Sequence, residues 1–98
     1  MADKTPQTQT FSSVWDAIGD TPAEAANMKL RAQLMMALCA HIAAQGWSQA
    51  EAARHLAVTQ PRISDLMRGK IGLFGLDTLV NMLDAAGLRL LARVEKAA

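Results

Sequence analysis

The stretch from Trp47 to Arg68 constrains the fold of this 98-residue chain more than any other part of it. Ser48, followed three residues later by Glu51, has the spacing of a capping box and predicts the start of a short helix. Thr59 followed by Pro61 predicts the start of a second helix, because the fixed φ and missing N–H of proline suit a first helical turn. The stretch therefore predicts two short helices joined by a tight turn.

One face of each short helix is apolar, which predicts that the two helices pack against a shared core. The inward residues are Ala52, Ala53 and Leu56 on the first helix and Ile63, Leu66 and Met67 on the second. The two alanines are small, so the second helix is expected to approach the first closely.

The outer face of the second helix is polar and carries Gln60, Arg62, Ser64, Asp65 and Arg68. A short rod with such groups suits the major groove of B-DNA, which is about 12 Å wide and presents a distinct hydrogen-bonding pattern for each base pair. The net charge of +1 does not by itself indicate a nucleic-acid partner. Between Trp47 and Lys70, however, four basic residues outnumber two acidic ones, a local charge of +2 that supports the same hypothesis.

At these residues the chain resembles the helix-turn-helix of the Cro/repressor (XRE) family. The residues that carry the resemblance are Ser48-Gln49, Ala53, Val58-Thr59-Gln60, Ile63-Ser64 and Leu66, and the match extends from about Met28 to Leu90. It implies an all-α, lambda-repressor-like bundle of about five helices. The segments Val14–Ile18 and Ala25–Arg31 also resemble a small XRE subgroup that includes HigA-type antitoxins.

One residue departs from the family pattern. The family usually places glycine in the turn, where the backbone visits positive φ, and this chain has Ala57. Alanine there costs roughly 1–2 kcal/mol if the left-handed conformation is kept. Either the turn absorbs that strain or its geometry differs slightly.

A long helix is predicted to precede this motif. Thr21, Pro22 and Glu24 form a strong start signal, and the helix is expected to run to about Gln45 and stop at Gly46. Its second half is apolar on nearly every side, so we expect it to be covered all round, with Met35 and Met36 in the core and Cys39 as a small buried hydrophobe.

The N-terminal residues divide into two expected segments. Residues 1–10 are polar and are expected to form a disordered arm. Phe11, Val14, Trp15 and Ile18 fall on one helical face, which predicts one or two helical turns that close the base of the bundle or offer a Trp anchor to a partner protein.

After the motif, the Gly-punctuated loop 69–75 is expected to meet DNA phosphates, with Leu73 and Phe74 holding it to the core. A helix is predicted from Leu76 to Ala86, with Leu76, Leu79, Val80 and Leu83 inward and Gly87 ending it. Residues 11–87 are thus expected to form the helical DNA-binding domain, with the helix-turn-helix at about 48–68.

Within the C-terminal residues 88–98, Leu88, Leu90, Ala92 and Val94 alternate with Arg89, Leu91, Arg93 and Glu95, and this period of two favours a strand over a short helix. A single strand is not stable alone, so the pattern predicts pairing with the same segment of a second subunit. The residues assigned to dimerisation are Leu88, Leu90, Ala92 and Val94.

The resemblance also assigns roles at the DNA. Gln60 and Arg62 are the best candidates for base edges, Gln for adenine and Arg for guanine. Thr59 and Ser64 are lesser candidates, and Asp65 either accepts from cytosine or orients Arg62. The expected phosphate contacts are Ser48, Gln49, Arg68 and Lys70.

The expected function is a transcriptional repressor that binds double-stranded DNA as a homodimer. The alternatives are an antitoxin that also binds a small toxin protein, and an interaction module without DNA binding. We expect no enzyme, cofactor or metal site, because the sequence has no phosphate loop, paired catalytic carboxylates or ligand spacing around His41 and His55. The longest nearly uncharged run, Ala32 to Ala44, is shorter than the roughly 20 residues of a membrane span, and the lone Cys39 fits a reducing cytoplasm.

Overall fold

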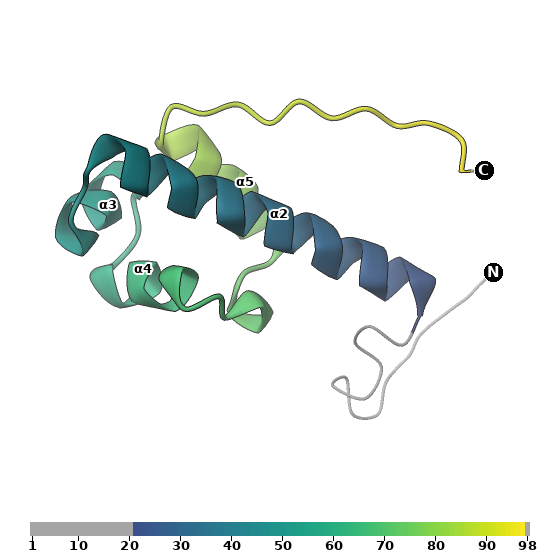
Figure 1. Cartoon of the computed structure of the whole chain (residues 1–98), viewed down its shortest axis with the longest axis horizontal. Coiled ribbons are helices and arrows are strands. Elements are labelled where there is room, and N and C mark those ends of the chain that lie inside the picture. The colour runs from purple at the N-terminus through teal and green to yellow at the C-terminus, as the bar shows by residue number, and fades with distance from the viewer. Residues whose placement is uncertain (1–20, 98) are drawn as a thin grey trace. The chain divides into compact units, whose positions relative to one another are not determined.

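The computed structural model describes residues 21–97 of the chain (Figure 1). The chain divides into two units, residues 1–30 and residues 31–98, and the packed helices belong to the second unit. The arm expected at residues 1–10 and the helical turns expected at 11–18 lie outside the described residues.

All regular secondary structure in the described residues is helical. In chain order they form α2 (Pro22–Gln45), α3 (Gln49–Leu56), α4 (Gln60–Met67), the 3-10 helix η1 (Ile71–Leu73) and α5 (Leu76–Ala85). The all-α architecture is therefore confirmed, but this part of the chain holds four α-helices rather than five and no strand. No helix within it is long and apolar enough to cross a membrane.

The caps that start the two short helices are those expected. The Ser48 hydroxyl accepts from the Glu51 backbone N–H at 3.1 Å, and the Ser48 N–H donates to the Glu51 carboxylate at 2.8 Å. The Thr59 hydroxyl accepts from the Arg62 N–H at 3.4 Å, with Pro61 in the first turn of α4. Each cap joins residues that are three positions apart, which explains why the local sequence predicts both helix starts.

A single hydrophobic core joins the helices of the second unit. Its members are Leu34, Met35, Leu38, Ile42, Ala52, Ala53, Leu56, Ile63, Leu66, Phe74, Leu79, Met82 and Leu83. Helix α3 lies at its centre and packs against both α4 and α5. Ala52 is fully buried and Ala53 nearly so, as expected for the inward face of α3.

Several apolar side chains expected inside are exposed instead. Met36 exposes 68% of its surface, because the core lies along the side of α2 that carries Leu34 and Leu38. Met67 at the end of α4 is 45% exposed and Leu73 in η1 is 48% exposed, so of the two residues expected to hold the loop to the core only Phe74 is buried. Val80 of α5 is also exposed, and Met82 takes its place in the core.

The turn between α3 and α4 keeps the left-handed conformation although it lacks glycine. Ala57 has φ 60° and ψ 40°. Hydrogen bonds on both sides hold it there: the Val58 N–H donates to the Ala53 carbonyl at 3.0 Å, and Thr59 then caps α4. The turn therefore absorbs the strain, and the family geometry is preserved.

The C-terminal residues do not form the expected strand. Gly87, at φ 82°, ends α5, and the Leu88 N–H donates back to the Leu83 carbonyl at 2.9 Å. Leu88 is half-buried against the core, whereas Leu91 and Val94 are 81% and 96% exposed. A strand needs a neighbouring strand for its hydrogen bonds, and the described part of this single chain offers none.

Substitution of Ala57 by glycine is expected to stabilise the protein. Glycine adopts positive φ without a Cβ penalty, and a Cβ there costs roughly 1 kcal/mol, so Ala57→Gly should raise the free energy of unfolding by about that amount. Urea denaturation measures it. Ala50→Gly, inside α3, is the control and should destabilise by roughly 0.5–1 kcal/mol. If Ala57→Gly lowered the free energy of unfolding as much as Ala50→Gly does, the strain at Ala57 would be contradicted.

The capping box predicts an acid-dependent contribution to stability. The hydrogen bond from the Ser48 backbone, together with that from its side chain, lowers the pKa of Glu51 below its ordinary value. A lowered pKa means that the stabilisation is present above the ordinary carboxylate pKa and is lost as pH falls through the folded value. Glu51→Gln should therefore lower Tm at neutral pH, and the Tm difference should close in strong acid. A Tm difference that stays the same in strong acid would contradict this contribution.

Candidate DNA interface

Helix α4 presents the side chains expected to read bases, but not all to the same degree. Thr59 and Gln60, at its start, are exposed. Arg62, Ser64 and Asp65 are half-buried. The outward row is therefore best exposed at the N-terminal end of α4, which is the end that helix-turn-helix proteins bring to base edges.

Arg62 lies against the aromatic ring of Phe74. Its guanidinium carbon is 5.0 Å from the ring centroid, a cation–π geometry. Phe74 itself is fully buried, so its ring forms a fixed support at the edge of the core. A supported guanidinium keeps its charge and its planar donors, which are the features that match the acceptors of guanine.

Asp65 forms an ion pair with Lys70, with its carboxylate oxygen 3.6 Å from the lysine Nζ. Among the described residues the structure records no ion pair between Asp65 and Arg62. The idea that Asp65 orients Arg62 is therefore unsupported, and the carboxylate orients Lys70 instead. Arg68, which ends α4, is exposed beside this pair.

The structure brings the start of α3 next to the end of α4. The Gln49 amide nitrogen lies 3.8 Å from the Met67 sulfur, so two of the four phosphate candidates, Gln49 and Arg68, come from adjoining helix ends. Ser48 is exposed, although its hydroxyl already accepts in the capping box. Its O–H proton is still available to a phosphate oxygen.

Trp47, which precedes α3, contacts the rings of His41 on α2 and His55 on α3. The rings of Trp47 and His55 stack with centroids 4.0 Å apart and planes 7° apart, and His41 meets Trp47 edge-on at 5.3 Å. His55 therefore has a structural contact rather than an evident role at DNA. The described residues contain no group of three His, Cys, Asp or Glu side chains able to hold a metal ion.

Arg31 is a residue that the sequence reasoning missed. From α2 its Nη1 donates to the carbonyl oxygens of Ile71 at 3.2 Å and Phe74 at 3.5 Å. Its Nε is buried and has no hydrogen-bond partner. Helical spacing was the available signal, because Arg31 precedes Leu34 and Leu38 by three and seven residues and so shares the face that the core covers.

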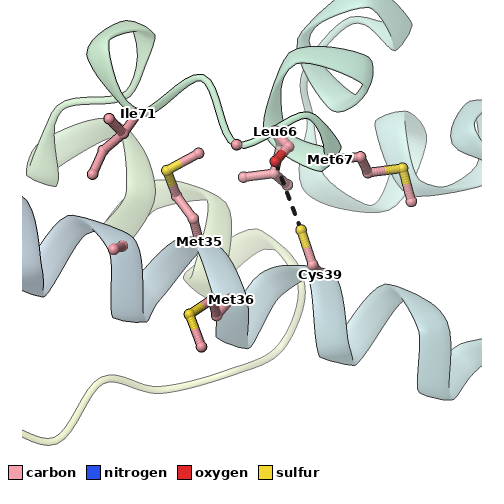
Figure 2. Close-up of a pocket in the computed structure, with 8 residues that line it drawn as sticks. Met35, Met36, Cys39, Leu66, Met67 and Ile71 are labelled. Atoms are coloured by element: carbon pink, nitrogen blue, oxygen red, sulfur yellow. Dashed lines mark hydrogen bonds between the residues drawn. The ribbon is translucent and has the colours of Figure 1, made fainter.

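An apolar pocket of about 390 Å³ lies between α2 and the end of α4 (Figure 2). It is lined by Ala32, Met35, Met36, Cys39, Leu66, Met67, Gly69 and Ile71. The Cys39 thiol points from α2 toward the Leu66 carbonyl oxygen, 3.8 Å away (Figure 2). Desolvation by burial raises the pKa of this thiol, which favours the neutral form. None of the residues expected to contact bases lines the pocket.

Comparison with known proteins places this geometry in a family. A family model described as "Helix-turn-helix domain" matches residues 17–95. A solved structure named as an XRE family transcriptional regulator is 30% identical, with a TM-score of 0.71, over 76% of this chain and 83% of that one. No match was found among curated proteins. The chain therefore belongs to the helix-turn-helix family of DNA-binding transcription regulators, and it is of the XRE type.

Proposed function

We propose that this chain is a sequence-specific repressor that binds an inverted-repeat operator as a homodimer. The observation that carries the proposal is the packing of α4 against α3, with both helices burying apolar side chains in the shared core. This contact holds α4 rigidly while its N-terminal end stays exposed. A rigid helix with exposed polar residues at its start can lie in the major groove and contact base edges.

Base reading is assigned to α4 and the residue before it. Gln60, exposed at the first position of the helix, is suited to the N6 and N7 atoms of adenine. Arg62, supported by Phe74, is suited to the O6 and N7 atoms of guanine. Asp65 can accept from cytosine N4, with Thr59 and Ser64 as secondary contacts.

Backbone phosphates are assigned to residues that flank α4. Arg68 and Lys70 are exposed beyond its C-terminal end, and Ser48 and Gln49 are exposed at the start of α3. Because these positions lie at the C-terminal end of α4 and at the adjoining start of α3, their contacts would fix the register of α4 on the duplex without reading sequence.

The homodimer is supported by the C-terminal segment. Residues 89–97 are extended, and no backbone hydrogen bond is recorded for them within the described part of the chain. Leu90, Ala92 and Val94 recur on alternate positions and are exposed. Pairing of residues 88–94 with the same residues of a second copy would satisfy the backbone groups of this part of the segment. Two recognition helices about 34 Å apart would then read two half-sites.

Arg62→Ala is expected to relax base preference at one operator position, at a cost of about 1–3 kcal/mol for the preferred base. The measurement is fluorescence anisotropy on a duplex selected by the wild-type protein from a random-sequence library, and on its single-base variants. Arg54→Ala, which removes one exposed positive charge from α3, is the control. It should weaken binding to all variants about equally. Unchanged preference in Arg62→Ala would refute the assignment.

The wider proposal has its own test. A mobility shift at low salt with the promoter of the chain's own gene is the expected result for an autoregulatory repressor. The absence of any shift, by a protein that circular dichroism shows to be folded, would instead favour an interaction module that does not bind DNA.

Ala92→Pro is expected to weaken the dimer, because proline removes a backbone donor from the proposed strand pair. A homodimer carries the substitution in both subunits. The free energy of dimerisation should therefore weaken by at least about 1 kcal/mol, which raises the dissociation constant roughly fivefold. Analytical ultracentrifugation measures it. Ala97→Pro, close to the chain end, is the matched control and should leave the constant unchanged. A monomeric wild-type protein at micromolar concentration would contradict the dimer.

A further inference from the structure

A single side chain of α2 holds the loop that follows the recognition helix. Arg31 donates from one nitrogen to the carbonyl oxygens of Ile71 and Phe74, at 3.2 and 3.5 Å. These two carbonyls lie at the start of η1 and just beyond its end. The contact therefore ties α2 to both ends of the turn that leads away from α4, across 40 and 43 residues of sequence.

The second carbonyl belongs to the residue that supports Arg62. Phe74 is fully buried, and the Arg62 guanidinium carbon lies 5.0 Å from its ring centroid. The contacts thus form a continuous chain from Arg31, through the backbone and ring of Phe74, to Arg62. Arg31 itself belongs to α2 and is not among the residues that we propose to contact DNA.

The contacts of Arg31 indicate that its hydrogen bonds, rather than its volume, are what matters at this position. Arg31 is half-buried, and its Nε is buried without a hydrogen-bond partner, which costs free energy. No carboxylate forms an ion pair with Arg31 among the described residues. Methionine would fill a similar volume beside Leu34 and Met35 without that cost. What arginine adds is a donor aimed at two main-chain carbonyls.

We infer that Arg31 is a positioning residue for base recognition: it fixes Phe74, which in turn holds the Arg62 guanidinium in place for one base pair. The inference rests on the proposed base-reading role of Arg62. It adds a specificity determinant on a helix that does not itself read the DNA. A guanidinium that is not held in place has to be ordered on binding, and this reduces discrimination between bases.

The test uses Arg31→Met, which removes the donors and keeps the side-chain length, and Phe74→Leu, which keeps an apolar side chain and removes the ring. Each full-length variant is titrated against the duplex that the wild-type protein selects from a random-sequence library, and against that duplex with each base pair changed. The ratio of dissociation constants at each position is the readout. Arg89→Met is the matched control, since it removes the same charge from an exposed site. Circular dichroism and thermal melts define a temperature at which all variants are folded.

The expected result is a roughly three- to tenfold loss of discrimination in Arg31→Met and Phe74→Leu at the position where Arg62→Ala loses it. Discrimination at the position read by Gln60 should be unchanged. Combination with Arg62→Ala should add no further loss at the Arg62 position, because the three residues act through one contact. Arg89→Met should lower affinity alone, and by a similar factor for every duplex.

The two failures are distinguishable. If Arg62→Ala itself alters no base preference, the proposed base-reading role of Arg62 is wrong. If Arg62→Ala alters one preference while folded Arg31→Met and Phe74→Leu keep it, the positioning role of Arg31 is wrong. A uniform loss of affinity at every position in Arg31→Met, greater than that of Arg89→Met, would show a purely structural role and would also overturn the inference.

Discussion

The contact between α3 and α4 is the constraint on which the rest of the structure depends. Helices α3 and α4 pack against each other, and both bury apolar side chains in the shared core, among them Ala52 and Ala53 of α3 and Ile63 and Leu66 of α4. Larger side chains at the alanine positions would disturb this packing, because a packed core tolerates little added volume. The small volume of these two residues therefore contributes to the position of α4.

The turn that joins these helices carries a strain that the packing offsets. Ala57 adopts a conformation in which its Cβ is unfavourable, at roughly 1–2 kcal/mol. The Ser48–Glu51 capping box and the Thr59 cap start the helices on either side of the turn. The shared core then holds these two helices together. An unfavourable local conformation persists because the surrounding structure leaves no alternative.

Several of the side chains that we propose to contact DNA are held by other residues of the protein. Arg62 rests on Phe74, Asp65 pairs with Lys70, and Arg31 ties the intervening loop to α2. Side chains at the outward face of a short helix would otherwise sample several rotamers, and ordering them on binding costs about 0.5–1.5 kcal/mol each. Contacts that already hold these side chains in the free protein reduce that cost.

Local chemistry was enough to predict the helix-turn-helix of this protein. The caps at Ser48 and Thr59, the apolar faces of α3 and α4 and the chain reversal at Gly87 all involve residues a few positions apart, so their spacing is visible in the sequence. The exposure of Met36 and Leu73 was not visible, because it depends on which element lies opposite each side chain. The same holds for Arg31 and Phe74, which are 43 residues apart and meet only once α2 and η1 are packed. Sequence by itself determined which helices form, whereas tertiary structure decided which side chains of those helices are held, covered or left exposed, because burial depends on neighbours that are distant in the chain.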